Sequence, residues 1–410
     1  MTADRVNLRT MPVRLWPWWS QHAIDLVGGL LECGDLAGAD AGHQQIDACE
    51  QMASHTLAAG RPVMMCDSGT AALETLYAAL GLGRGSEVLV ASHSFRATVT
   101  AMLPAGLVPV LCDADPGTGH IDLDDAATRV TARTAALVVT HTWGRPADLD
   151  RIRAFADRHH LVLLEDCSHA HGTRWQGRAV GTVGDAAVWS TGTTKMVSGG
   201  KAGLLTCTDR QVWERAMVLA QPKHRAAARV DGAQLLALTA TGAGHNRRVH
   251  PVAAVLVTDH LIRLPHTLAA KNERQSNIET VLAAELPWLQ PLPAPQGHVD
   301  GALYKWHWRS TGRPGSDTAR VLSAAGIRAR LPAAPLHRLP LFTDDRLGAL
   351  LGLRRLVTPD PATFPGTRAL LEGLVEIDTR DMYESLPDGD TDPAVAALER
   401  AASLTTKECA

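Results

Sequence analysis

Residues 161–172 read LVLLEDCSHAHG, an apolar run that leads into two acids and then two histidines. A short apolar run of this kind is typical of a strand that is buried on both faces of a parallel sheet. In open α/β sheets, ligands bind beyond the carboxyl ends of the strands. Asp166, near the end of the run, is therefore predicted to lie beside a ligand, unless it only caps a helix that follows.

The same kind of apolar run recurs along the first part of the chain. The runs are PVMM, EVLVAS, VPVLCD, AALVVTHTWG, LVLLEDC, AAVWS and AGLLTCT. Between them lie helical stretches such as TAALETLYAALGLG, in which Leu73, Leu76, Tyr77 and Leu80 fall on one helix face. Strands that alternate with helices in this way predict an α/β fold with a mostly parallel sheet covered by helices on both sides.

The pattern changes near residue 250. The sequence there predicts one long helix, or two shorter helices with a break at Pro265. Further on, ALYKWHWRS alternates like a strand with two different faces, and the rest is mixed. We expect residues 1–255 to form an N-terminal segment and a large domain, and residues 256–410 to form a small α+β domain. Near the end, Asp392 and Pro393 predict the start of a helix.

The composition excludes several classes of protein. The 410 residues are 45% hydrophobic and 20% charged, with a formal net charge of -3, so the charge does not favour nucleic acid or an acidic membrane as a partner. No apolar run reaches the ~18 residues of a membrane span, and the first residues lack the features of a secretory signal. The seven cysteines are widely spaced without a CxxC pair, which indicates buried free thiols in a reducing cytoplasm.

A candidate anion-binding site lies at residues 67–73, DSGTAAL. Ser68, Gly69 and Thr70 follow an apolar strand and open a helix, where free backbone N–H groups and the helix dipole attract an anion. Taken alone, the stretch is explained at least as well by a hydroxyl that caps the helix. Neither GLGRGSE, which follows a helix, nor SGGKA, which lacks the P-loop spacing, fits a nucleotide-binding loop.

Two lysines, Lys195 and Lys201, lie in the stretch WSTGTTKMVSGGKAG, residues 189–203. An anion-binding helix start, an aspartate at a strand end and a later lysine together suit pyridoxal 5'-phosphate. The lysine forms an imine with the cofactor's aldehyde, the aspartate keeps the pyridine nitrogen protonated, and the helix start holds the phosphate. A metal site at His169 and His171 is a weaker alternative, because this spacing is poor for two ligands on one helix.

With these residues in place, the chain resembles the DegT/DnrJ/StrS family of fold-type-I pyridoxal-phosphate aminotransferases over roughly residues 12 to 405. The motifs that carry the resemblance, in family order, are SGTAAL, ASHSFRATVTAML, PVLCDADPGTGHID, THTWGRPADLD, EDCSHAHGTRWQGRAVGTVGDAAVWSTGTTK, GHNRRVHPVAA and PLHRLPLF. The resemblance implies a seven-stranded sheet in the large lobe and amino-group transfer from glutamate or glutamine. It also implies a keto-sugar, keto-cyclitol or related ketone as acceptor, in a secondary-metabolite pathway such as antibiotic biosynthesis.

The resemblance also implies roles for individual residues. Lys195 matches the lysine that binds the cofactor, and Asp166 matches the partner of the pyridinium nitrogen. The other cofactor contacts that it implies are Ser68, Gly69, Thr70 and Ser190 at the phosphate, Phe95 stacked on the ring, and His169 at the ring hydroxyl. Asn246 matches an asparagine that reaches the phosphate of the neighbouring subunit, which implies a homodimer with shared active sites.

One motif departs from the family pattern. Residues 200–203 read GKAG where members usually have GEGG, so Lys201 reverses a charge close to the predicted substrate entrance. Lys201 is therefore a candidate contact for an anionic substrate, with a solvent-exposed lysine as the alternative. Arg248, which falls near the predicted subunit junction, is a second candidate substrate contact. The departure leaves two other functions open: pyridoxal-dependent elimination or carbon–carbon chemistry, and a catalytically impaired partner subunit.

Overall fold

The computed structural model describes most of the 410 residues. The described residues are 16–36, 43–243, 245–292, 298–299, 301, 303–344, 346, 359–379, 382 and 392–408. Residues 1–15, which were examined for a secretory signal, and Cys409 lie outside them. Six cysteines fall within the described residues and all six are free; Cys33 is exposed and the other five are buried. The prediction of buried thiols is therefore correct for all of these cysteines except Cys33.

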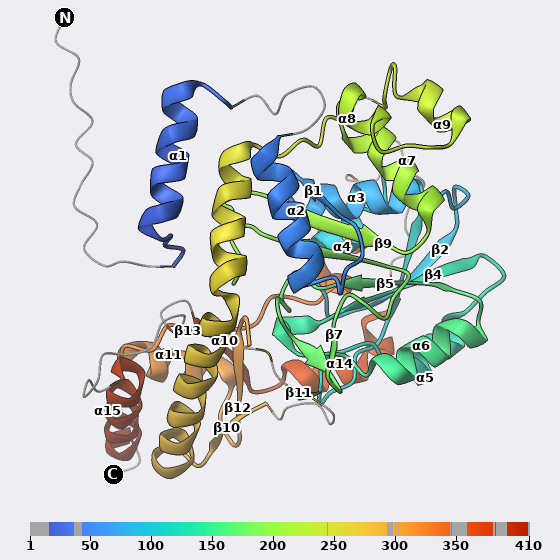
Figure 1. Cartoon of the computed structure of the whole chain (residues 1–410). Helices are drawn as coiled ribbons and strands as arrows, with labels where there is room; N and C mark the ends of the chain where they lie inside the picture. The colour runs from blue at the N-terminus through green and yellow to red at the C-terminus, as the bar shows by residue number, and fades with distance from the viewer. Residues whose placement is uncertain are drawn as a thin grey trace, which may run out of the picture.

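A seven-stranded sheet forms the centre of the large lobe (Figure 1). Its strands are β1 (Val63–Cys66), β2 (Glu87–Ala91), β3 (Val108–Cys112), β4 (Thr134–Thr140), β5 (Val162–Asp166), β8 (Ala186–Ser190) and β9 (Gly203–Cys207). They lie in the order β1-β9-β8-β5-β4-β2-β3, and only β9 runs antiparallel to its neighbours. The predicted fold is confirmed, because all seven apolar runs of the sequence are strands of this mostly parallel sheet.

Helices cover both faces of this sheet. They are α2 (Gln44–Thr56), α3 (Gly69–Ala79), α4 (Arg96–Thr100), α5 (Leu123–Arg129), α6 (Leu149–Arg158), α7 (Arg210–Ala220), α8 (Lys223–Ala227) and α9 (Ala233–Leu238). Alternate strand residues pack into different cores: Leu163 faces the core shared with α2, α5 and α6, whereas Leu164 faces the core shared with α3, α4 and α7. Because both faces are buried, the strands are mostly apolar, as the sequence indicated.

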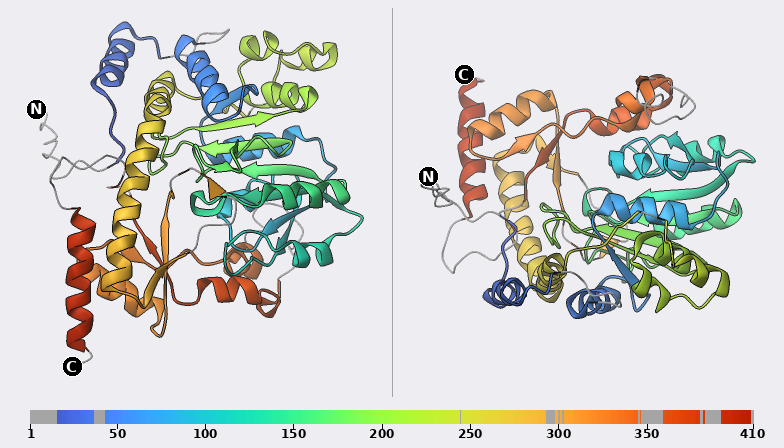
Figure 2. Two further views of the ribbon diagram at one scale, coloured as in Figure 1. Left: turned by 60° about the horizontal axis from the view of Figure 1, so that its bottom comes forward. Right: turned by 90° about the horizontal axis from the view of Figure 1, so that it is seen from above.

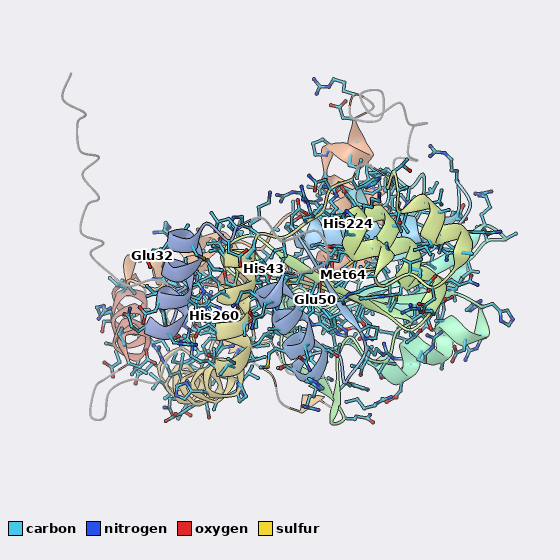
Figure 3. All side chains as sticks on the ribbon, turned by 45° about the horizontal axis from the view of Figure 1, so that its top comes forward. Glu32, His43, Glu50, Met64, His224 and His260 are labelled. Carbon is cyan, nitrogen blue, oxygen red and sulfur yellow. The ribbon has the colours of Figure 1, made fainter. Side chains whose placement is uncertain are left out.

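Buried polar contacts fasten the covering helices to the sheet. Glu50 of α2 accepts a hydrogen bond from the backbone N–H of Met65 in β1, at 2.8 Å, and another from Arg225 of α8, at 2.5 Å. Figure 3 labels Glu50 on α2 and Met64 on β1, the strand residue before the Met65 that donates to Glu50. An unpaired buried carboxylate would be strongly destabilising, so the arginine and the amide together allow Glu50 to lie in the core.

The helix α10 (Pro251–Glu285) joins the two lobes and is continuous over 35 residues. Its first half packs into the large lobe through residues such as Ala254 and Leu261, and its second half packs into the small lobe through Ile278 and Leu282. Pro265 lies within the helix on its exposed face, and the helix continues through it. The single long helix is thus formed, and the predicted boundary at residues 255–256 falls inside it.

The small lobe is an α+β layer packed below the sheet in Figure 1. Its antiparallel sheet has the order β10 (Leu289–Pro291), β12 (Trp306–Ser310), β14 (Leu374–Ile377) and β13 (Ala329–Arg330). Its helices are α11 (Gly315–Ala324) and α15 (Pro393–Glu408). The helix α12 (Pro340–Thr343) packs into the large-lobe core through Leu341 and Phe342, and α14 (Pro365–Leu371) places Leu370 in a small cluster with Ala114 and Leu374. As predicted, α15 begins at Pro393, and Asp392 accepts a hydrogen bond from the N–H of Ala394, at 2.9 Å.

The remaining elements lie at the edges of the two lobes. They are α1 (Gln21–Cys33), the short strands β6 (Arg174–Trp175), β7 (Arg178–Ala179) and β11 (His298–Val299), and the 3-10 turns η1 (Thr142–Gly144), η2 (Leu336–Arg338) and η3 (Pro361–Thr363). The two views in Figure 2 show α1 and α15 along the same side of the molecule as α10, away from most of the large sheet. Within the described ranges, no helix is long and apolar enough to cross a membrane.

Candidate active site

A cavity of about 280 Å³ lies beyond the carboxyl ends of the parallel strands, between the large and small lobes. Its walls come from the start of α3, from the segments after β2, β4, β5 and β8, and from the small lobe. It is close in size to small-molecule sites in other proteins. Of the predicted site residues, the cavity brings together Gly69, Thr70, Phe95, Asp166, His169, Ser190 and Lys195.

The start of α3 packs directly against the end of β8. A Cβ atom on Gly69 would lie 2.6 Å from Cβ of Ser190, and one on Gly203 would lie 2.4 Å from the carbonyl oxygen of Ser68. Only glycine fits at both positions, because these distances are far below a van der Waals contact. The close approach puts the first turn of α3 and Ser190 on one wall of the cavity, where free N–H groups can bind an anion.

Ser68 has a different place from the other residues predicted at the phosphate. Its hydroxyl accepts a hydrogen bond from the N–H of Ala71, at 3.1 Å, and so caps α3. Ser68 is not among the residues that line the cavity. The two explanations of the DSGTAAL stretch are thus compatible, since Ser68 caps the helix while Gly69 and Thr70 face the cavity.

Asp166 ends β5 and is buried, with 2% of its surface exposed. One carboxylate oxygen accepts a hydrogen bond from the hydroxyl of Thr98, at 2.8 Å, and the other accepts from the N–H of Ser168, at 3.1 Å. These two bonds fix the orientation of the carboxylate. A carboxylate can accept about four hydrogen bonds, so Asp166 retains capacity for a ring N–H in the cavity.

Lys195 follows β8 and extends into the same cavity. Burial lowers the pKa of its ammonium group to about 7; Asp166 acts in the opposite direction, and the positive charge of Lys305 lowers it further. The Lys195 Nζ atom also lies 4.4 Å from the centre of the Tyr304 ring. Above about pH 7 the amine is therefore mostly neutral, which is the form needed for a nucleophile or a general base.

Residues far away in the sequence hold the loop of Lys195 in place. The indole N–H of Trp16 donates to the backbone carbonyl of Lys195, at 2.7 Å. His260 of α10, labelled in Figure 3, accepts from the N–H of Ser198, at 2.9 Å, and its ring stacks on Trp16 with the centroids 4.5 Å apart. The N-terminal segment and α10 thus restrict the positions that the Lys195 side chain can take.

His169 lies against Tyr304 of the small lobe, with the ring centroids 4.5 Å apart. Its Nδ1 atom accepts a hydrogen bond from the N–H of Trp143, at 3.3 Å, which leaves the proton on Nε2. Burial, together with the charges of Lys195 and Lys305, holds the pKa of His169 well below its usual value. The ring is thus neutral and has one N–H available to a ligand.

The remaining four predicted contacts are solvent-exposed in the single chain, and only Phe95 among them lines the cavity. Phe95 lines the cavity with 48% of its surface exposed, and Arg96 stacks over its ring. Lys201, Asn246 and Arg248 are exposed and are not among the described residues that line the cavity. Arg248 donates to the side-chain oxygen of Asn246, at 2.6 Å, so these two side chains form one surface pair.

Several cavity residues were not found from the sequence. They are His93, Trp143, Tyr304, Lys305 and Glu376. Thr98, which is buried behind Asp166 and donates to it, was not found either. Tyr304 is placed next to the lysine because its hydroxyl hydrogen-bonds that of Thr194, at 2.8 Å. The stretch ALYKWHWRS does place a tyrosine and a lysine just before a predicted strand. No local pattern, however, shows that this stretch lies beside a site in the other lobe.

A buried group near the cavity resembles a metal site in composition. His141, Glu165 and Cys167 bring their donor atoms within 4.8 Å of one another. However, Nε2 of His141 bonds Glu165 at 2.9 Å, while Nδ1 accepts from the N–H of Ala147, at 3.1 Å. Glu165 also accepts backbone N–H groups from the loop at residues 181–184. Since the donor atoms of His141 and Glu165 are already engaged, this group stabilises the loop rather than forming a metal site.

Comparisons with known proteins agree with this geometry. The model of the DegT/DnrJ/EryC1/StrS aminotransferase family matches residues 44–351. The L-glutamine:2-deoxy-scyllo-inosose aminotransferase of Streptomyces paromomycinus is 32% identical over 375 residues, which are 87% of this chain and 86% of that protein. The enzyme of the same name from Streptoalloteichus tenebrarius is 30% identical over 369 residues, with 87% and 86% covered.

Solved structures share the fold over nearly the whole chain. The aminotransferase TlmJ from Streptoalloteichus hindustanus is similar with a TM-score of 0.76 and 26% identity, over 96% of this chain and 99% of that one. The 3-amino-5-hydroxybenzoic acid synthase is similar with a TM-score of 0.78 and 24% identity, over 96% and 98%. The second similarity is one of fold alone.

Proposed function

Because the chain belongs to the DegT/DnrJ/EryC1/StrS aminotransferase family, we propose that it moves the amino group of L-glutamine or L-glutamate to a cyclic polyhydroxy ketone, with pyridoxal 5'-phosphate as cofactor. Family membership confirms the predicted class of enzyme, an aminotransferase. The donor and the ketone are proposed from the names of the 2-deoxy-scyllo-inosose aminotransferases, which act on a keto-cyclitol. The keto-cyclitol is the acceptor class that we favour over a keto-sugar.

The observation that carries the proposal is the arrangement of three features around one cavity. Asp166 approaches it from the end of β5, Ser190 and Lys195 from the end of β8 and the segment after it, and the start of α3 from the segment after β1. They match the three parts of the cofactor that need protein contacts: the ring nitrogen, the aldehyde carbon and the phosphate. The glycine at residue 69 supports this fit, since it lets the first turn of α3 pack against Ser190, where a Cβ atom would lie 2.6 Å from Cβ of Ser190. An impaired partner subunit is disfavoured because Asp166 and Lys195 are both present.

Pyridoxal phosphate, when bound, supplies an electron sink that makes the donor's α-proton acidic. Lys195 is proposed to hold the cofactor and then, as a neutral amine, to take the α-proton on Nζ and deliver it to the C4' atom. Asp166 keeps a proton on the ring nitrogen, and the Nε2–H of His169 is available to the ring hydroxyl. Phe95 would cover the ring face. The pKa of about 7 at Lys195 suits proton transfer in both directions near neutral pH.

The function is tested by adding candidate amino donors to the cofactor-loaded protein and recording its absorbance. We expect glutamine or glutamate to convert the cofactor to its amine form, and a keto-cyclitol to restore the aldehyde form with release of an aminocyclitol detectable by mass. The conversion rate should rise with pH through about 7, because the neutral form of Lys195 increases there. If no amino acid produced the amine form, or if the donor were instead eliminated with the aldehyde retained, the proposal would be wrong.

We further propose a homodimer in which Asn246 contacts the phosphate in the neighbouring subunit's site. Asn246 is exposed and has a left-handed backbone with φ of 43°, a conformation that asparagine tolerates better than most residues. It lies outside the cavity of its own chain, so a role at a phosphate requires a second chain. Lys201 and Arg248, also exposed, stay predicted substrate contacts for such a dimer.

Mixing two inactive variants should test the shared site. Lys195→Ala and Asn246→Asp chains are each expected to be inactive, the second because its carboxylate repels the phosphate. In a mixed dimer, one site combines an intact lysine with an intact asparagine, so activity should return to at most roughly a quarter of wild type. Each variant re-mixed with itself is the control. No recovery, despite mixed dimers isolated with two affinity tags, would contradict the shared site.

A further inference from the structure

The small lobe contributes a second lysine to the active-site cavity. Lys305, just before β12, and Glu376 of β14 form one wall of it, opposite the strand ends of the large lobe. Among the described residues that line the cavity, Lys195 and Lys305 are the only lysines or arginines. Their Nζ atoms lie 4.4 Å and 5.8 Å from the centre of the same Tyr304 ring, so both face one small space.

Two basic side chains, Lys305 and Arg330, pair with the single negative charge of Glu376. The Nζ of Lys305 lies 2.9 Å from each of its carboxylate oxygens. Arg330 donates two further hydrogen bonds to one of these oxygens, at 2.7 Å and 2.5 Å. Burial alone would raise the pKa of Glu376, but His307 and Lys305 lower it to about 2, so it remains ionised. Arg330 would therefore still neutralise Glu376 if Lys305 moved away.

The proposed reaction places opposite demands on this cavity. The donor is an α-amino acid, whose carboxylate needs a cation, while the keto-cyclitol has hydroxyl groups and no charge. Lys195 cannot supply the cation, because it works as a neutral amine beside the reacting carbon. A free cation fixed in the wall would favour the donor and any other anion, whereas a neutral wall would bind the donor weakly.

We propose that Lys305 is the residue that recognises the donor: its ammonium group leaves Glu376 to bind the donor's α-carboxylate, and returns to Glu376 when the ketone occupies the cavity. This inference rests on the proposed function, since it assumes an amino acid and a polyol as alternate substrates. When the donor is bound, Lys305 exchanges the carboxylate of Glu376 for the carboxylate of the donor. When the ketone is bound, the paired Lys305 and Glu376 offer hydrogen-bond donors and acceptors to the hydroxyl groups of its ring.

The structure permits this movement. The side chain of Lys305 is 25% exposed, whereas that of Glu376 is 5% exposed and is fixed by Arg330. A lysine carries its charge on a flexible four-carbon stem, so its ammonium can change partners without movement of the strand. Glu376 stays in place because β14 pairs with both β12 and β13 in the centre of the small-lobe sheet.

The substitution Lys305→Met tests the inference in the two half-reactions. The variant should need on the order of 50-fold more glutamine for half-maximal conversion of the cofactor, because a charged hydrogen bond is lost. Its half-reaction with the aminocyclitol that corresponds to 2-deoxy-scyllo-inosose should change less than about threefold, since that amine has no carboxylate. Both substrates use Lys195, so an indirect effect through the pKa of Lys195 would alter both alike. Arg320→Met, which removes an exposed charge from α11, is the matched control.

Binding of glutarate to the cofactor-loaded protein, measured by calorimetry, is a readout that does not depend on turnover. Lys305→Met should weaken glutarate on the order of 50-fold, Lys305→Arg should retain most of the affinity, and Arg320→Met should retain all of it. The double variant Lys305→Met/Glu376→Gln should still bind glutarate weakly. If it regained wild-type affinity, Lys305 would serve only to neutralise Glu376, and the inference would be overturned.

The two proposals fail in different ways. If wild-type protein accepted no amino donor, the proposed function would fall, while the glutarate measurement would still decide whether Lys305 binds a carboxylate. If wild-type protein used glutamine and the aminocyclitol, but Lys305→Met affected both equally or neither, the aminotransferase function would stand and donor recognition by Lys305 would be wrong.

Discussion

Replacement of Lys195 by alanine is expected to lower kcat by at least about 10,000-fold, because it removes both the cofactor-binding amine and the proton carrier. Among the described residues that line the cavity, Lys305 is the only other lysine, and its ammonium group is paired with a carboxylate in both proposed states, that of Glu376 or that of the donor. Lys201 is exposed and lies outside the cavity. The phosphate site at the start of α3 is unchanged by the substitution, so the variant should still bind pyridoxal phosphate, but without a covalent link.

Borohydride reduction followed by peptide mapping checks this prediction independently of turnover. In wild-type protein the pyridoxyl group should appear on the peptide that contains Lys195, and in Lys195→Ala it should be absent. Cofactor retained by the variant should be removable by dialysis. A tag on Lys201 or Lys305 in wild-type protein would overturn the assignment, and so would substantial turnover by the alanine variant.

The second large effect is expected for Asp166→Asn, with a loss of about 3 kcal/mol or more in transition-state stabilisation, which is on the order of a hundredfold in rate. An asparagine has nearly the same shape and can still accept from Thr98 or Ser168 through its oxygen. It has no negative charge, however, and cannot hold a proton on the ring nitrogen. The electron sink would be weakened while the cavity kept its shape.

Single-turnover kinetics with the preferred donor measures the effect of Asp166→Asn. The rate of conversion to the amine form should fall, while the thermal unfolding temperature and the cofactor content should stay near those of wild type. Thr98→Val is a useful companion, since it keeps the charge of Asp166 and removes the orienting bond of 2.8 Å, along with the bond that Thr98 accepts from Ser94 at 3.3 Å, so its loss should be much smaller. Full activity of Asp166→Asn would contradict the proposed role of the aspartate.

The sequence by itself determined the large lobe and the side of its sheet on which Asp166 and Lys195 meet in one cavity. Strands with both faces buried are mostly apolar, so each of the seven runs could be recognised from its own residues. Asp166 and Lys195 were predictable because each follows such a run, and in a parallel sheet the carboxyl ends of the strands meet at one edge. Gly69 was predictable for a similar reason, as a glycine that opens a helix after a strand.

Only the tertiary structure decided which distant residues complete the cavity. Tyr304, Lys305 and Glu376 come from the small lobe, and their positions depend on how that lobe packs against the strand ends rather than on any local pattern. The continuity of α10 through Pro265 was likewise open in the sequence, because the helix is stabilised by burial in both lobes. Local periodicity determines secondary structure and strand ends, whereas contacts between residues more than a hundred positions apart exist only once the two lobes have packed together.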